Sequence, residues 1–148
     1  MRYFSTQEDL DLDTLEAALK QVDPRYCITD RFEEDRGEGA TGVTGELRVG
    51  DEVFAVITVD RPPLADEIDE MLDEIADYQS VAADRVREVL RTCRASVAVQ
   101  VLGQERETEA TLQRIDSIWE WLFPNRPGLM QADGEGFYDS RGLILEVR

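Results

Sequence analysis

Apolar residues recur along this chain at two spacings, one typical of strands and the other of helices. Short runs rich in aromatic and β-branched residues predict strands. These runs cover Tyr3–Ser5, 25–32, Val43–Val49, Glu52–Val59, Ala95–Leu102, Leu129–Ala132, Gly136–Asp139 and Leu143–Val147. Turn residues at Gly50-Asp51 and Asp133-Gly134 predict hairpins, and the acidic, glycine-rich stretch 33–42 is predicted to be a loop. The continuous apolar run Phe54–Ile57 predicts a central strand that is buried on both faces.

Three segments carry apolar residues at helical spacing. The first follows Asp13-Thr14-Leu15-Glu16, which predicts an N-cap at Asp13, and it ends at Pro24. The longest is predicted over Leu64–Cys93, because its apolar positions fall in one stripe about 100° wide. The third is predicted over Thr108–Phe123. Helices and strands together predict an α+β fold.

The order strand, helix, three strands occurs twice along the chain. Residues 1–60 form one βαβββ-like half, residues 95–148 form the other, and residues 61–94 contain the long connecting helix. Each half has a helix followed by a proline and a Gly-Glu pair near a hairpin, which indicates a degenerate internal duplication. We therefore expect a single compact domain over residues 1–148, with a mostly antiparallel sheet and helices on one face. A ligand or a second subunit would bind the exposed sheet face or the groove between the halves.

This order of elements resembles in outline the βαβββ units of the vicinal oxygen chelate class, to which the glyoxalases belong. Those enzymes hold a divalent metal with His and Glu side chains. The present chain contains no His. The resemblance therefore assigns no metal ligands here, and no cofactor is expected.

The charge balance of the chain is strongly negative, with 33 Asp and Glu, 16 Lys and Arg, no His and a formal net charge of −17. Nucleic acid is not an expected partner, because its phosphates would meet a negative field. Without His, Ser-His-Asp and Cys-His catalytic centres and His-ligated metals are excluded. No stretch approaches the roughly 18 apolar residues of a membrane span, and two cysteines form no disulfide framework, so we expect a cytoplasmic protein without membrane contact.

The densest acidic segment lies in the first half of the predicted long helix. Four of its carboxylates have the spacing of one helix face: Asp66, Glu70, Asp73 and Asp77. This face is either simply solvated or binds a basic protein. A metal is a weaker alternative, because a dinuclear carboxylate site in a helix bundle normally includes a Glu-x-x-His pair.

Two further pairs of residues are candidates for binding. Trp121 points away from the apolar stripe of its helix, and with Tyr138 it would border an exposed aromatic patch suited to a protein or dimer interface. Glu46 and Glu135 lie at matched positions in the two halves. They are the carboxylates expected in a groove between the halves, where they would serve a ligand or acid–base chemistry.

Together these observations favour a non-catalytic, acidic interaction or regulatory module over an enzyme. A negative surface attracts basic partners and accelerates their encounter, so a regulator or inhibitor of a basic protein would fit. The alternative is a small-ligand binder or an enzyme that uses carboxylate and Arg groups in the groove. A third interpretation is that the acidity reflects only the salt environment of the organism.

Overall fold

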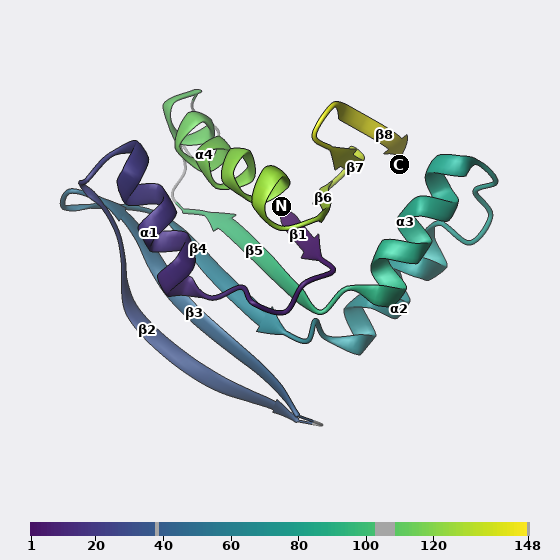
Figure 1. The fold of residues 1–148 in the computed structure, drawn as a ribbon, viewed down its shortest axis with the longest axis horizontal. Helices are drawn as coiled ribbons and strands as arrows, with labels where there is room; N and C mark the ends of the chain where they lie inside the picture. Colours follow the sequence, from purple (N-terminus) through teal and green to yellow (C-terminus); the bar gives the residue numbers. More distant parts are fainter. Residues whose placement is uncertain (38, 103–108, 148) are drawn as a thin grey trace.

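The protein is one eight-stranded antiparallel sheet with helices packed on both of its faces (Figure 1). The computed structural model describes residues 1–37, 39–102 and 109–147. The predicted α+β class and mostly antiparallel sheet are confirmed. The elements are β1 (Arg2–Ser5), α1 (Leu12–Val22), β2 (Tyr26–Gly37), β3 (Ala40–Val49), β4 (Glu52–Arg61), α2 (Ala65–Glu74), α3 (Val81–Thr92), β5 (Ala95–Val101), α4 (Glu109–Asn125), β6 (Gly128–Ala132), β7 (Gly136–Asp139) and β8 (Gly142–Glu146).

Each half of the chain has the predicted order of one strand, one helix and three strands. The strands lie in the order β2-β3-β4-β5-β1-β6-β7-β8. At the centre of the sheet, β5 therefore pairs with β4 of the first half, and β1 pairs with β6 of the second half. In the first half the last strand of the meander, β4, lies nearest the centre, whereas in the second half it is the first strand, β6. This opposite order gives no support to an internal duplication.

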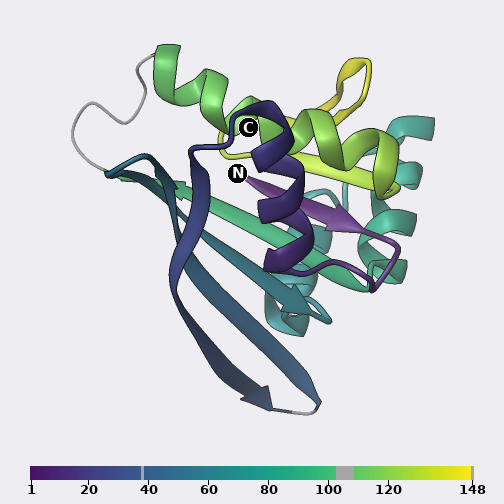
Figure 2. The ribbon, with the colours of Figure 1, turned by 60° about the vertical axis from the view of Figure 1, so that its left-hand side comes forward.

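The helices cover opposite faces of the two ends of the sheet, so the expectation of helices on one face is wrong. Adjacent residues of β1 show the division, because successive side chains of a strand point to opposite faces. Tyr3 packs in one core with α1, α4 and the inner residues of β2–β5. Phe4 packs in a second core with α2, α3 and β6–β8. Figure 2 shows α1 and α4 on the near side of the strands.

The single long helix predicted over Leu64–Cys93 is wrong, because the chain forms two helices with a turn between them. Ser80 caps α3 by accepting a hydrogen bond from the backbone N–H of Ala83 at 3.0 Å. Arg87 of α3 donates to the backbone oxygens of Ile75, at 2.8 Å, and Tyr78, which lie in the segment that follows α2. The apolar stripe continues through the break because both helices pack on the same core.

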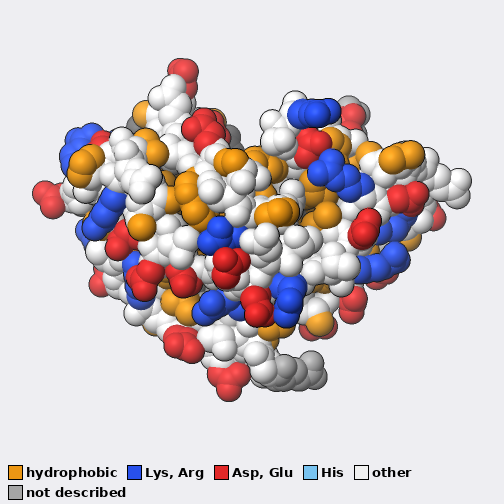
Figure 3. Space-filling model, in the orientation of Figure 1, with side chains coloured by type: hydrophobic (Ala, Val, Ile, Leu, Met, Phe, Trp, Pro, Cys, Tyr) orange, Lys and Arg blue, Asp and Glu red, His pale blue; other side chains and the backbone are white. Residues whose placement is uncertain are grey.

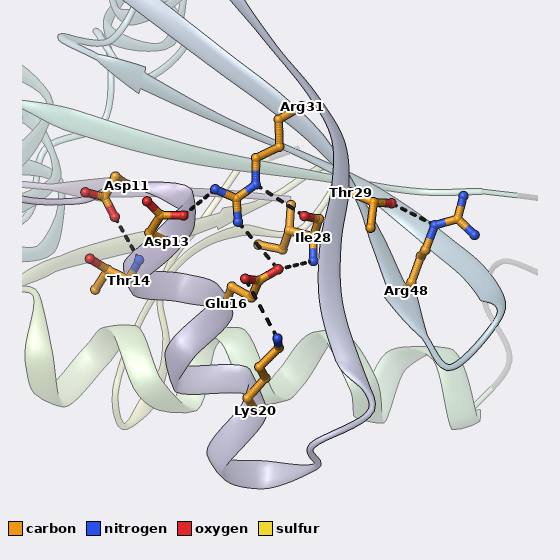
Figure 4. Close-up of polar contacts among 9 residues, drawn as sticks. All are labelled: Asp11, Asp13, Thr14, Glu16, Lys20, Ile28, Thr29, Arg31 and Arg48. Carbon is orange, nitrogen blue, oxygen red and sulfur yellow. Dashed lines mark hydrogen bonds and ion pairs between the residues drawn. The ribbon is translucent and has the colours of Figure 1, made fainter.

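The start of α1 and its contact with β2 differ from the predicted capping box (Figure 4). The N-cap is Asp11, whose Oδ1 accepts from the N–H of Thr14 at 2.7 Å. Glu16 accepts instead from the backbone N–H of Ile28 in β2 at 2.6 Å. Arg31 of β2 pairs with both Asp13 and Glu16. These contacts fasten the edge strand β2 to the helix that covers it.

The predicted loop 33–42 is instead part of a long hairpin, in which β2 extends to Gly37 and β3 starts at Ala40. A register shift lies between Thr29 and Phe32, where Asp30 has a φ of 51°. Beyond this bulge, Phe32 pairs with Thr44 of β3.

In the described residues no helix combines the length and apolarity needed to cross a bilayer.

Candidate functional site

One face of the sheet is uncovered over β2–β5. Side chains that point toward α1 and α4, such as Leu47 and Ile57, are 0% exposed. Their neighbours on the opposite face are half-buried or exposed, and Phe32 is 51% exposed. We call this surface the open face; its residues are Thr29, Phe32, Thr44, Glu46, Val56, Thr58, Ala98 and Gln100. Val56 is only half-buried, so the prediction that the Phe54–Ile57 strand is buried on both faces is wrong.

The side of α2 forms one border of the open face. Glu67 pairs with Arg2 of β1 at 3.6 Å, and Arg2 lies opposite Ala98 of the open face. Glu70 and Glu74 follow Glu67 at three and seven residues, so they lie on the same side of the helix. The segment 65–77 contains seven Asp and Glu and no Lys or Arg. This border is therefore strongly negative.

A nearly buried ion pair crosses three strands at the end of the open face. Asp60 of β4 is 6% exposed, and its Oδ1 lies 3.3 Å from Nε of Arg36 of β2. Gly42 of β3 lies between them, and only a residue without Cβ leaves room for this contact. Burial raises the pKa of Asp60; the positive charge of Arg36 opposes this rise, and the negative charge of Glu67 adds to it.

We expect Gly42→Ala to separate this ion pair. A Cβ at this position would lie 2.5 Å from both Arg36 Nε and Asp60 Oδ1, so the flexible guanidinium must move. Leaving a buried carboxylate without its partner costs about 1–3 kcal/mol of unfolding free energy. Because the folded-state pKa of Asp60 is raised, the cost of the ionised form appears as pH rises through that pKa and is absent at lower pH.

Urea unfolding at neutral and mildly acidic pH measures this effect. The loss from Gly42→Ala should be larger at neutral pH, and it should shrink when Asp60→Asn is also present. An equal loss at both pH values, and in both backgrounds, would show that the ion pair does not carry the effect.

A groove of about 780 Å³ opens beside the open face where β1 begins. It lies between the end of β5 and the β6–β7 turn, and Figure 3 shows a hollow between α4 and the β6–β8 meander. Its lining includes open-face residues together with Met1, Arg2, Val101, Leu112, Asp133 and Glu135. An adjoining hollow of about 340 Å³ shares Ala132 and Asp133 with the groove and reaches Glu74 of α2. The groove thus connects the open face with the acidic border.

Two positive groups of the groove are already engaged by the protein. Arg2 pairs with Glu67, and the Met1 ammonium donates to the backbone oxygen of Val99 at 3.4 Å. Burial lowers the pKa of this ammonium, whereas the negative charge of Asp133 raises it. The rim carboxylates of Asp133 and Glu135 are exposed, and neither forms an ion pair with a residue that the structure describes.

The predicted acidic face is only partly on one helix. Asp66, Glu70 and Asp73 are exposed on α2, but Asp77 lies in the turn after it, so the expected continuation of one face to residue 77 is wrong. The reason is the end of α2 at Glu74. Among the described residues no cluster of three or more His, Cys, Asp or Glu has the arrangement of a metal site.

Of the other predicted residues, Tyr138 and Glu135 are in contact, whereas Trp121 and Glu46 lie elsewhere. Trp121 is half-buried beneath the Arg126 guanidinium, which lies 5.2 Å from its ring centre. The Tyr138 hydroxyl donates to Glu135 at 2.8 Å, which brings this tyrosine to the rim of the groove. Glu46 lies on the open face and pairs with Arg48 at 3.1 Å.

Sequence reasoning missed the Arg36–Asp60 pair and the role of Phe32. Both depend on which strands are neighbours and on the bulge in β2. The one available signal is the alternation of polar with apolar residues in β3 and β4, such as Thr44 and Thr58, which indicates strands with one solvent-exposed face.

Burial also raises the pKa of Cys93 to about 11, so this thiol stays protonated at neutral pH.

No family model matches this chain, and neither the curated proteins nor the solved structures contain a match. The resemblance in element order to the vicinal oxygen chelate class therefore gains no support from these comparisons.

Proposed function

We propose that this protein is a non-catalytic regulatory module that binds a basic protein partner across its open face. The observation that carries the proposal is the open face itself, with the acid-only segment of α2 along its border. An uncovered sheet face offers a broad contact surface, and the acidic border supplies attraction for a positive partner.

Apart from Glu67, which pairs with Arg2, the carboxylates of α2 support this role because they form no ion pair with a described residue. Five exposed acids of this helix form no ion pair with any described residue: Asp66, Asp69, Glu70, Asp73 and Glu74. Asp73 and Glu74 lie in the last turn, where the helix dipole disfavours negative charge. Acids placed against the dipole cost stability, and binding gives a reason for them.

The composition of the open face favours a different protein over a second copy of this chain. Its residues are mostly small or polar, which suits a hydrated interface, and Phe32 supplies one exposed aromatic anchor. Two copies would each bring a net charge of −17 to the contact. Like charges across an interface oppose association, whereas a basic partner relieves the repulsion.

A deca-arginine peptide is the probe for this proposal, with NMR titration as the measurement. We expect shift changes at the open face and α2, and weaker binding as salt is added. The triple variant Glu70→Gln, Asp73→Asn, Glu74→Gln should weaken binding about tenfold, the equivalent of three surface ion pairs of about 0.5 kcal/mol each.

The matched control removes the same charge elsewhere. Asp51, Asp116 and Glu120 are exposed and form no ion pair with any described residue. Their amide variants should change the affinity less than about twofold. Equal weakening by both triple variants, or shift changes spread over α1 and α4, would overturn the proposal.

The second candidate function is binding of a small ligand, which the 780 Å³ groove favours. In that case a small molecule would bind in the groove with no contribution from the α2 carboxylates.

A further inference from the structure

We propose that the groove at the start of β1 binds one arginine side chain of the basic partner. This inference rests on the proposed function, and it names the group that the partner places beside the open face. The hydrogen-bonding groups, the charges and the shape of the groove support it.

The rim of the groove presents hydrogen-bond acceptors that are held in place and only half used. Asp133 Oδ1 accepts from the side-chain nitrogen of Gln131 at 3.1 Å, and Glu135 Oε1 accepts from the Tyr138 hydroxyl at 2.8 Å. Within the described part of the chain, the second oxygen of each carboxylate has no hydrogen-bond donor. The side-chain oxygen of Gln131, a residue that lines the adjoining hollow, is buried and accepts no hydrogen bond from the residues that the structure describes. An occupant of this region must therefore bring donors.

The charge of the described residues around the groove also favours a positive occupant. Arg2, the cation in the floor, is paired with Glu67. The Met1 ammonium is bound to Val99 O and partly buried. Asp133 and Glu135 thus remain without an ionic partner among the described residues, and Glu74 adds a third carboxylate in the adjoining hollow.

The walls of the groove suit a side chain with an aliphatic stem. Val56, Val101 and Leu112 line it, and Leu112 is 38% exposed without an occupant. An arginine would place its three methylene groups against these residues and its guanidinium at the rim. Guanidinium carries five donors and no acceptor, and its fixed fork can contact two carboxylates at once. Lysine offers a smaller ammonium without this geometry, so arginine should bind more tightly.

N-acetyl-arginine methylamide is the probe, used with a protein that starts at Met1, because added residues would emerge into the groove. NMR titration should give binding of about millimolar strength, with shift changes at Val56, Gln100, Val101 and Leu112. The citrulline counterpart, which has the same shape and no charge, should bind at least about tenfold more weakly.

Two matched double variants locate the binding. Asp133→Asn with Glu135→Gln should weaken arginine binding at least about fivefold. Glu33→Gln with Glu88→Gln makes the same change in charge at exposed acids away from the groove, and it should have no effect. Equal binding of citrulline, equal effects of both pairs, or shift changes outside the groove would overturn the inference.

Failure of this inference can be told apart from failure of the proposed function. If deca-arginine still distinguishes the two triple variants while the arginine derivative does not bind in the groove, the interaction module stands and the arginine site is wrong. If the derivative binds in the groove but the triple variants behave alike, the open face is not the docking surface and the groove is a site for a small cation.

Discussion

Gly128→Ala is expected to lower the free energy of unfolding by about 4 kcal/mol or more, enough to prevent folding of many domains. Gly128 begins β6 and pairs with Ser5 of the central strand β1. A Cβ here would lie 1.9 Å from the backbone oxygen of Phe4 and 2.8 Å from its carbonyl carbon. Backbone in the middle of a sheet cannot move aside as a surface side chain can. The clash must therefore separate β1 from β6.

Urea unfolding measures this loss, and Gly50→Ala serves as the control. Gly50 has a φ of +60°, and a Cβ added there would meet no atom within 4 Å, so alanine brings backbone strain of about 1 kcal/mol without a clash. If Gly128→Ala lost no more stability than this control, the close approach of β6 to β1 would be wrong.

Tyr3→Ala should be the most damaging change at a core side chain, with a loss of about 4 kcal/mol. Tyr3 is 0% exposed. Its ring stacks on Trp119 with 6.4 Å between ring centres and meets Phe123 edge-on at 5.2 Å. Its hydroxyl donates to the backbone oxygen of Arg126 at 2.5 Å. One side chain thus joins the central strand to α4 and to the segment that follows it.

Tyr3→Phe separates the two contributions of this residue. It keeps the ring and removes the hydrogen bond, so we expect a loss of about 1–2 kcal/mol. Thermal and urea unfolding of both variants, followed by tryptophan fluorescence, test the order of the two losses. Equal losses would mean that the ring packing contributes little.

Local sequence patterns predict the elements of this fold well, because each depends on residues that are close in the chain. The hairpin at Gly50-Asp51 and the strand–helix–three-strand order of each half follow from turn residues and from the spacing of apolar positions. The same local patterns do not predict the break between α2 and α3. Ser80 is a good N-cap, but the apolar positions before and after it continue with helical spacing, so the pattern shows no break. The hydrogen bond from Arg87 to the backbone just after α2 comes from the next helix and cannot be read from the local sequence.

The arrangement of the elements and most of the candidate site could not be predicted in the same way. Which face each helix covers depends on β1 lying between β5 and β6, and no short-range pattern encodes that pairing. The open face exists because α3 contacts β1, β6 and β8, and α2 packs with α3 in the core that these strands share. The acidic segment at Asp66–Asp73 is recognisable from composition alone, whereas its place beside Arg2 is not.

The central place of β1 also bears on how the protein is made. This strand is synthesised well before its two neighbours, which are supplied by residues 95–101 and 128–132. The middle of the sheet therefore cannot close until residue 132 has been synthesised. Pairings across such long stretches of sequence form slowly, so nascent chains should expose the unpaired edges of β1 until β5 and β6 have been synthesised, and they should benefit from chaperones during that interval.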